Sequence, residues 1–452
     1  MTSYLRKKRK KMAERTRAEK AAIYGLIIIG AILFLLKPRW GIIYLACLAM
    51  TEFALDMLLP KLRKRFPWLI MEEDEKPVLP EEGLKKFFRI GWDKELGWVR
   101  KPNTSKEEIA KYGRSRWSIN ERGARSNPGH EGLPRVISCY GDSFTFARQV
   151  NDNETWEWHL SELTKTNVMN FGVGNYGLGQ ALIRLKREYP RNPTKIVIMG
   201  VVPSTIVRVL SFWKHYNEFG NTFAFKPMFK LENDNLVLLP NPINTKKKFR
   251  EYTKYLDYIR EEDYFYERKF IREMIKWPYI ASIVSFPRRH LPLIYAITED
   301  WAREKIRKIT GGKEKEQPYP EPMRVIMKEN LLLRYNLFTK DKYAVKLLKA
   351  LVNEFKKYAE TKNFVPVFLW MPQKDDVLFI AGKGNYYEGF IRFVRKNMLT
   401  VDMTPILLRK HKSREGSLDK FYSDDSKYGG HYSVEGNKLV AREVYKKIKN
   451  LL

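Results

Sequence analysis

The sequence predicts a doubly wound α/β fold, in which helices cover both faces of a parallel β-sheet. Short apolar segments typical of buried strands alternate with longer amphipathic segments typical of helices. The predicted strands cover residues 135–140, 168–171, 196–202, 365–371 and 399–403. The predicted helices cover residues 154–164, 179–188, 342–361, 386–396 and 434–451. Ligands of such sheets bind beyond the carboxyl ends of the strands, so polar residues at those ends are the first candidates for function.

Length and composition agree with one large α/β domain that carries additional parts. The chain has 452 residues, of which 44% are hydrophobic, enough for a sizeable core, an insertion and an N-terminal region. Its two cysteines, Cys47 and Cys139, lie in apolar segments, so the sequence indicates no disulfide framework. The six histidines are scattered and none has the spacing of metal ligands. We therefore expect neither a metal site nor a cofactor.

The N-terminal region predicts membrane association. Residues 1–20 carry nine Lys and Arg against two Glu, and two apolar stretches follow at residues 21–36 and 40–60. A helix needs about 20 apolar residues to cross a bilayer, so the second stretch is long enough and the first is short. We predict a basic tail (1–20), a transmembrane hairpin (21–60) and a linker (61–90).

The charges beside the apolar stretches predict the orientation of this multi-pass anchor. The basic tail and the basic run 61–65 place both ends of the hairpin, and with them the catalytic domain, on the cytoplasmic side. The basic turn at 37–39 leaves open a single crossing with the domain outside. Glu52 and Asp56 share one helix face and are costly in lipid, which leaves an interfacial amphipathic helix as a second alternative.

The net charge of +32 favours anionic partners. Such a surplus attracts anionic lipid head groups, acidic polysaccharide or nucleic acid. The sequence contains no recognised nucleic-acid motif and no compact basic-aromatic repeat, so we expect no nucleic-acid partner.

A candidate nucleophile follows the first predicted strand. The strand leads directly into Gly141-Asp142-Ser143. Glycine allows a sharp turn that would leave the hydroxyl of Ser143 free to attack a substrate. The same tripeptide also makes ordinary turns, and its interpretation depends on what accompanies it.

Two further segments supply what a nucleophilic serine requires. The glycine-rich run 170–180 follows the second predicted strand, where backbone N–H groups can hold an oxyanion; its alternative is an ordinary strand-to-helix connection. His431 precedes the last predicted helix, with Asp424 and Asp425 upstream and two glycines between. A base and the acid that orients it need these residue types. The alternative is a solvated loop histidine.

The three segments, in this order, resemble those of the SGNH (GDSL-type) hydrolase superfamily. The resemblance extends from Gly91 to the C-terminus and includes segments 93–103 and 118–125, which are similar to the lead-in of membrane-associated and polysaccharide-linked members. It implies a three-layer, flavodoxin-like α/β/α sheet. It also implies that Ser143 is the nucleophile, that His431 is the general base, and that the Ser143 N–H contributes to the oxyanion hole.

The oxyanion hole departs from the family pattern. Ser204 stands where the family has asparagine, and a hydroxyl can still donate a hydrogen bond, though with less reach. The glycine of the hole falls on Asn175, a residue type that tolerates a left-handed backbone, with Gly174 beside it. We expect Ser143, Gly174, Asn175 and Ser204 to form the hole.

The acid departs from the pattern as well. Tyr428 occupies the place of the family aspartate, three residues before His431. We therefore expect Asp425, or else Asp424, to fold back to the imidazole through the flexible Gly429-Gly430.

The resemblance also organises the rest of the chain. The hydrolase domain would comprise residues 91–204 and 342–452, separated by a helical, basic and aromatic insertion at 205–341 that is either a lid or substrate platform, or a packing domain. The predicted protein is a membrane-anchored serine esterase that hydrolyses an acyl or acetyl ester of a small molecule, glycan or lipid through an acyl-enzyme. The alternatives are an O-acyltransferase acting on glycan or lipid and a non-catalytic, membrane-anchored binding protein.

Overall fold

The computed structural model describes residues 15–311, 320–412 and 417–452. Residues 1–14 of the predicted basic tail, residues 312–319 of the predicted insertion and residues 413–416 lie outside the described residues. The chain divides into two compact units. The first contains residues 1–78, 215–222 and 256–329, and the second contains residues 79–214, 223–255 and 330–452.

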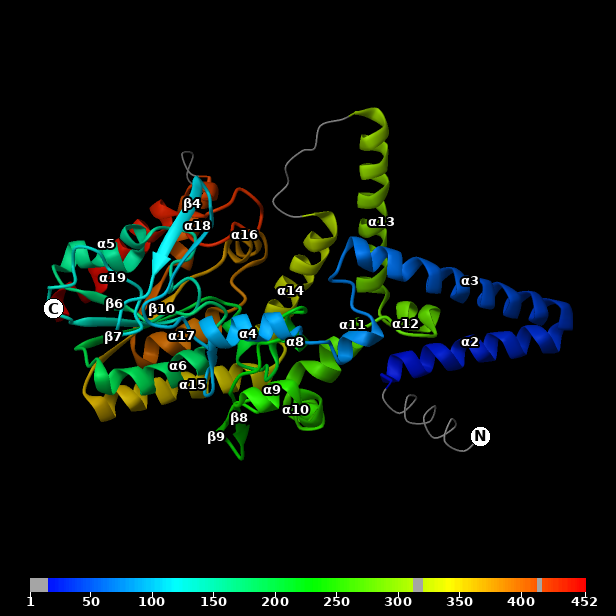
Figure 1. The fold of residues 1–452 in the computed structure, drawn as a ribbon, viewed down its shortest axis with the longest axis horizontal. Helices are drawn as coiled ribbons and strands as arrows, with labels where there is room; N and C mark the ends of the chain where they lie inside the picture. The colour runs from blue at the N-terminus through cyan, green and yellow to red at the C-terminus, as the bar shows by residue number, and fades with distance from the viewer. Residues whose placement is uncertain (1–14, 312–319, 413–416) are drawn as a thin grey trace. The chain divides into compact units, whose positions relative to one another are not determined.

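The second unit is built on a five-stranded parallel sheet (Figure 1). Its strands are β5 (Ile137–Gly141), β6 (Val168–Asn170), β7 (Ile196–Val201), β10 (Val365–Trp370) and β11 (Leu399–Asp402). Their spatial order is β11-β10-β7-β5-β6, so the chain winds outward in both directions from β5 and β7. This is the flavodoxin-like order, with its switch point between β5 and β7. The five predicted strands and the predicted fold class are confirmed.

Helices cover both faces of the sheet, which makes three layers (Figure 1). One face carries α5 (Trp156–Thr164) and α19 (Val434–Ile448), and the other carries α6 (Leu178–Glu188), α15 (Lys342–Lys362) and α17 (Glu388–Asn397). All five lie where the sequence predicts helices. Each buries an apolar stripe; Trp156 and Leu160 of α5, for example, share a core cluster with Val440 and Val444 of α19.

The second unit also contains elements that the sequence analysis did not predict. They include two antiparallel hairpins before the sheet, the helix α4 and two helices after β10 and β11. Their bounds are α4 (Glu81–Ile90), β1 (Trp92–Asp93), β2 (Gly97–Trp98), β3 (Ser105–Ala110), β4 (Gly113–Ser118), α16 (Lys374–Lys383) and α18 (Thr404–Lys412). The hairpins are short and mostly polar, and therefore give weak periodic signals.

The predicted insertion 205–341 contributes to both units and is not entirely helical. Besides α7 (Thr205–Arg208), α8 (Lys214–Asn217) and α9 (Lys246–Arg250), it contains the antiparallel hairpin of β8 (Met228–Glu232) and β9 (Asn235–Leu239). Its other α-helices are α10 (Leu256–Glu262), α11 (Ile271–Glu273), α12 (Tyr279–Ser285), α13 (Pro287–Thr310) and α14 (Glu321–Thr339). The insertion, which was predicted to be helical, therefore contains a pair of strands besides its helices.

The first unit contains the two N-terminal helices, α2 (Arg17–Leu36) and α3 (Pro38–Arg65), which run side by side in Figure 1. They approach closely at their turn, because a Cβ atom on Gly41 would lie 2.6 Å from Phe34. Both helices are long and apolar enough to cross a membrane, and only 11% and 6% of their apolar windows are buried. The predicted hairpin is therefore present as two helices whose apolar surfaces remain exposed.

The two carboxylates of α3 have partners within the first unit. Glu52 accepts hydrogen bonds from the backbone N–H groups of Tyr279 (2.7 Å) and Ile280 (2.8 Å), at the start of α12. Asp56 accepts one from the Tyr279 hydroxyl at 2.7 Å. Glu52 thus caps the helix α12, which carries a partial positive charge at its N-terminus. The two acids hold α12 against the hairpin.

Candidate active site

The turn that carries Ser143 is fixed between β5 and β7. Gly141 ends β5, and a Cβ atom there would lie 1.8 Å from the carbonyl oxygen of Gly200 in β7, so only glycine fits. The carboxylate of Asp142 accepts hydrogen bonds from the N–H groups of Phe144 (2.8 Å) and Val202 (3.1 Å). Ser143 is therefore held at the sheet's switch point, with 5% of its surface exposed.

Asp142 also receives a charged partner. Arg208 donates to its Oδ2 atom at 3.1 Å and to the carbonyl oxygen of Tyr176 at 3.1 Å. Burial raises the pKa of Asp142, and the charge of Arg208 opposes that rise. Asp142 and Arg208 together thus connect the loops that follow β5, β6 and β7.

A buried arginine clamps the loop that continues from the turn. Arg125, at the end of the lead-in segment 118–125, donates to the carbonyl oxygens of Phe146 (2.7 Å), Ala147 (2.6 Å) and Val150 (2.7 Å). Within this loop Ala147 and Gln149 have φ angles of 54° and 68°. Left-handed backbone costs free energy at non-glycine residues and persists only where the surroundings enforce it. Arg125 supplies that enforcement.

The same loop holds the imidazole of His431. The Nδ1 atom of His431 lies 2.7 Å from Oε1 of Gln149, and the imidazole packs on the ring of Phe144 with centroids 5.0 Å apart. The Oε1 atom also accepts hydrogen bonds from the His431 backbone N–H (3.1 Å) and from the Ser423 hydroxyl (2.8 Å). These donors identify the oxygen of the amide, so Nδ1 must carry a proton and Nε2 is left with its lone pair.

Neither predicted aspartate contacts the imidazole. Asp425 lies 2.9 Å from the ammonium of Lys111, and 76% of its side chain is exposed. Asp424 accepts hydrogen bonds from the backbone N–H and the hydroxyl of Ser426 within its own loop. Gly429 and Gly430 do adopt left-handed conformations, with φ angles of 72° and 63°. The turn that they make brings His431 to Gln149 instead, and the expectation of an Asp425–His431 pair is corrected here.

Glu108 of β3 is the carboxylate that binds the loop segment Arg148-Gln149, and the sequence analysis missed it. It accepts hydrogen bonds from the Gln149 backbone N–H at 3.1 Å and from the Arg148 guanidinium at 2.6 and 3.0 Å. Burial alone would raise the pKa of Glu108, but its bonds with Arg148 lower it. A single acid in a polar hairpin gives no sequence signal of this role.

The surroundings of His431 keep its imidazole neutral. Removal of the ring from water lowers its pKa most, and the charge of Arg148 lowers it further; Glu108 opposes them, and Arg208 and Arg100 add to the lowering, to a value of about 3. A base with this pKa is unprotonated at neutral pH.

The candidate oxyanion donors lie at the same edge of the sheet. A Cβ atom on Gly174 would lie 4.0 Å from the Cβ of Ser143, so these two residues are neighbours. Asn175 has a φ of 68°, as its position in the glycine run suggested. The hydroxyl of Ser204, at the start of α7, is buried and has no hydrogen-bond partner among the described residues. The described residues contain no group of three or more His, Cys, Asp or Glu placed to hold a metal ion.

Several solved structures resemble the chain, whereas no family model and no curated protein matches it. They include a lipolytic protein of the G-D-S-L family from Desulfitobacterium hafniense, with 14% identity and a TM-score of 0.28 over 69% of this chain and 98% of that one. An acetylxylan esterase from Geobacillus stearothermophilus has 11% identity and a TM-score of 0.31, over 72% and 96%. The esterase EstA from Pseudoalteromonas has 11% identity and a TM-score of 0.29, over 70% and 98%.

Proposed function

We propose that the chain is a serine esterase with Ser143 as nucleophile and His431 as general base. The observation that carries the proposal is the hydrogen bond between His431 Nδ1 and Gln149 Oε1, at 2.7 Å. Gln149 belongs to the loop that begins with Ser143, and Phe144 of that loop packs on the imidazole. An alcohol on a rigid turn and a neutral imidazole of fixed tautomer are thus held by one loop, as covalent catalysis requires.

The reaction would proceed in two halves. The Ser143 hydroxyl attacks the ester carbonyl carbon while its proton passes to Nε2 of His431. The tetrahedral intermediate then collapses, the bond to the alcohol oxygen breaks, and the imidazolium returns the proton to the leaving alkoxide. Water attacks the resulting acyl-enzyme, again with His431 as base, and releases the carboxylic acid and free Ser143.

The oxyanion would be stabilised by backbone donors and by nearby positive charge. We assign the donor role to the N–H groups of Ser143 and of the Gly174-Asn175 pair, with the buried hydroxyl of Ser204 as a further donor. One such donor is typically worth about a hundredfold or more in rate. The charges of Arg100 and Arg208, which also depress the pKa of His431, favour an anion in this region.

The neutral amide at Nδ1 distinguishes this site from a Ser-His-Asp triad. Gln149 fixes the tautomer and orientation of His431, as an aspartate would. It does not offer the imidazolium a negative charge, so stabilisation of that ion is left to the more distant Glu108. We therefore expect a functional but slower enzyme than one with a carboxylate at Nδ1.

We also propose that α2 and α3 anchor the enzyme in a membrane, with the catalytic domain on the cytoplasmic side. The exposed apolar side chains of the two helices support this proposal, since soluble surfaces rarely carry apolar patches of that extent. The full chain should float with vesicles in a density gradient, and a variant that lacks residues 17–65 should not. Recovery of the full chain in the soluble fraction would refute the anchor.

The esterase proposal is tested by hydrolysis of p-nitrophenyl acetate by the full chain in detergent. The wild type should release p-nitrophenol well above the Ser143→Ala variant. Equal rates would indicate a binding protein without activity. Transfer of the acetyl group to an added saccharide in preference to water would identify the enzyme as an O-acyltransferase.

A further inference from the structure

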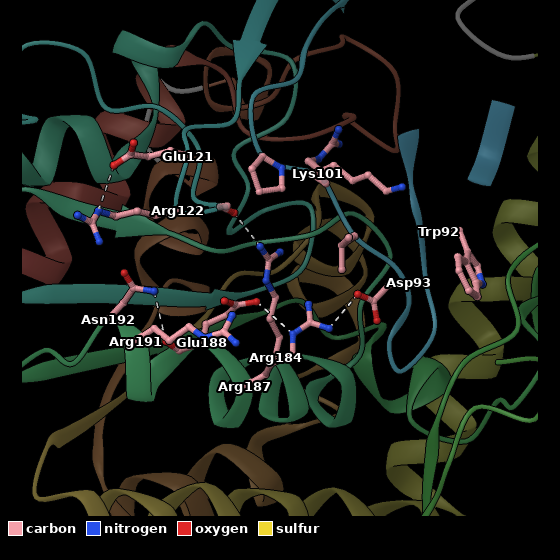
Figure 2. Close-up of a pocket in the computed structure, with 14 residues that line it drawn as sticks. Trp92, Asp93, Lys101, Glu121, Arg122, Arg184, Arg187, Glu188, Arg191 and Asn192 are labelled. Atoms are coloured by element: carbon pink, nitrogen blue, oxygen red, sulfur yellow. Dashed lines mark hydrogen bonds and ion pairs between the residues drawn. The ribbon is translucent and has the colours of Figure 1, made fainter. Parts of the chain in front are cut away.

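An open cavity of about 740 Å³ in the second unit shares no catalytic residue with the candidate site (Figure 2). Among the described residues, those that line it include neither Ser143, nor His431, nor a proposed oxyanion donor. Figure 2 shows Arg187 of this cavity beside Asp93 and Glu188, with which it forms ion pairs of 2.8 and 3.1 Å. The β3–β4 hairpin, in contrast, contacts both of the loops that carry the candidate site.

The hairpin binds the loop after β5 from both of its strands. Glu108 of β3 accepts a hydrogen bond from the backbone N–H of Gln149 at 3.1 Å. Ser118, which ends β4, donates to the carboxylate of Asp152 from its backbone N–H at 2.9 Å and from its hydroxyl at 2.7 Å. The hairpin is therefore anchored to the loop that orients the imidazole.

Lys111, in the turn of the same hairpin, reaches the loop before α19. Its ammonium donates to the carbonyl oxygen of Asp419 at 2.5 Å and to that of Tyr422 at 3.4 Å. It also forms the ion pair with Asp425, at 2.9 Å. A lysine of a hairpin turn would ordinarily extend into water, but the side chain of Lys111 is only 15% exposed. Three oxygen acceptors of one loop therefore hold this ammonium.

The two carbonyl groups belong to the segment 419–423, which pairs with His431. The backbone N–H of Ser423 donates to the carbonyl oxygen of His431 at 2.7 Å, and the His431 N–H donates to the Ser423 hydroxyl at 2.9 Å. Because Tyr422 and Ser423 are adjacent, a shift of the carbonyl group that Lys111 binds would also shift the partner of His431.

The base and the tip of the hairpin are held in different ways. Near the base, Trp117 of β4 is buried. At the tip, Ile109 and Tyr112 are 79% and 87% exposed. The tip is therefore held on the protein by the charged side chains Glu108 and Lys111, each of which binds a different loop. Hydrogen bonds with one charged partner are the stronger kind, so these two residues suit that role.

We propose that the β3–β4 hairpin clamps the loop after β5 to the loop before α19, and that Lys111 is the positioning residue for His431. The proposal rests on the serine esterase function and adds a residue that sets the geometry of its base. Lys111 acts through the carbonyl groups of Asp419 and Tyr422. Its loss should therefore slow the chemical steps, and so lower kcat, while KM stays nearly unchanged.

The Lys111→Met variant of the full chain in detergent tests the clamp, with p-nitrophenyl acetate as substrate. Methionine keeps an apolar stem but cannot donate, and we expect kcat to fall about tenfold or more with KM within about twofold of the wild type. Lys111→Arg keeps charged N–H donors and should recover at least about half of the wild-type kcat. The matched control is Lys106→Met, at an exposed lysine of β3, which should retain the wild-type kcat. A wild-type kcat in Lys111→Met would overturn the proposal.

Asp425→Asn separates the carbonyl contacts from the ion pair. It removes the charge that faces Lys111 but leaves both backbone acceptors in place. We expect its kcat to stay within about twofold of the wild type, because an exposed ion pair contributes little. An equal fall of kcat in Asp425→Asn and Lys111→Met would assign the effect to the ion pair and overturn the role of the carbonyl contacts.

Amide hydrogen exchange tests the clamp without turnover. The backbone N–H groups of Ser423 and His431 are both bonded within the loop and exchange when the loop opens. In Lys111→Met they should exchange about fivefold faster or more, whereas Lys106→Met should leave them unchanged. Unchanged exchange in Lys111→Met would overturn the clamp. An equal acceleration throughout the second unit would indicate a general loss of stability and would overturn the assignment as well.

The outcomes separate the clamp from the proposed function. An active wild type whose kcat does not respond to Lys111→Met would refute the clamp alone. A wild type no faster than Ser143→Ala would refute the esterase, and with it the catalytic purpose of Lys111. Faster exchange of Ser423 and His431 in Lys111→Met would in that case still support a clamp between the two loops.

Discussion

The turn after β5 and the loop before α19 supply the two halves of the candidate site, and they are held in different ways. The first is fixed by the sheet itself, because Asp142 bonds the start of the β7 loop and Arg125 clamps the backbone that follows. The second is fixed by the first, because Gln149 accepts both the side-chain and the backbone N–H of His431. The position of the His431 imidazole therefore depends on the loop that follows Ser143.

This difference means that changes in the two loops should have unequal consequences. Residues of the loop after β5 fix the positions of both Ser143 and His431. The acidic residues of the loop before α19, Asp424 and Asp425, fix neither. Polar residues close to a histidine in the sequence need not be its partners, since a left-handed turn such as Gly429-Gly430 can direct it elsewhere.

Removal of the nucleophile should have the largest effect. We expect Ser143→Ala to lower kcat/KM for p-nitrophenyl acetate more than about a thousandfold, because no acyl-enzyme can form. Steady-state release of p-nitrophenol measures the loss. Ser105→Ala, at an exposed serine of the same unit, is the control and should retain full activity. Comparable activity of Ser143→Ala and wild type would exclude covalent catalysis by this serine.

Removal of the base should have the next largest effect. His431→Gln keeps a polar side chain but cannot take the Ser143 proton, and we expect about a thousandfold lower kcat. A pre-steady-state burst of p-nitrophenol should slow by the same factor if acylation needs the base. His411, a residue of the last turn of α18, provides the control in His411→Gln, which should behave as the wild type.

The Gln149 contact tests the dependence of one loop on the other. Gln149→Leu removes the acceptor at Nδ1 and frees the imidazole to rotate and change tautomer, so we expect kcat to fall about 10- to 100-fold. Gln149→Glu places a carboxylate at Nδ1, which should raise the pKa of His431. The pH profile of kcat/KM would then acquire an acid limb at higher pH than in the wild type. An unchanged profile would indicate that residue 149 does not control the imidazole.

The low pKa of His431 predicts a weak pH dependence for the wild type. A base with a pKa of about 3 remains neutral below its usual value of 6.5, so lowering the pH leaves it competent. We expect kcat/KM to change less than about threefold between pH 5 and pH 8. An acid limb with an apparent pKa near 6.5 would show that the imidazole is solvated during catalysis. Circular dichroism at each pH confirms that the chain stays folded.

We expect the smallest effect from replacing Asp425, the acid that the sequence analysis assigned to His431. Asp425→Asn removes an exposed ion pair with Lys111, and such pairs contribute little to stability. We expect less than a twofold change in kcat and no measurable change in melting temperature. A fall of a hundredfold or more would instead place Asp425 at the imidazole during turnover and contradict the role given to Gln149.

Local sequence was sufficient for the elements that carry the site. The strands β5, β6 and β7 are apolar runs bounded by glycine or polar residues, and each is followed by a polar residue later found at the candidate site. The parallel fold brings those ends to one edge, so periodicity and connection rules place Ser143, Gly174 and Ser204 at that edge. Their candidate roles come from the resemblance to the SGNH hydrolases. The hairpins before the sheet lacked such a pattern, and with them Glu108 was missed.

By itself, the sequence determined the doubly wound sheet, the two apolar helices and the position of the Gly-Asp-Ser turn, because these depend on periodicity and on glycine at fixed positions. The candidate histidine came from the resemblance of its segment to the SGNH hydrolases. Only the tertiary structure decided which side chains meet. Gln149, which contacts His431, and Glu108, which contacts Gln149, come from a loop and a hairpin distant in sequence from His431. The directions of such side chains depend on single left-handed residues and on long-range packing, which no local pattern encodes.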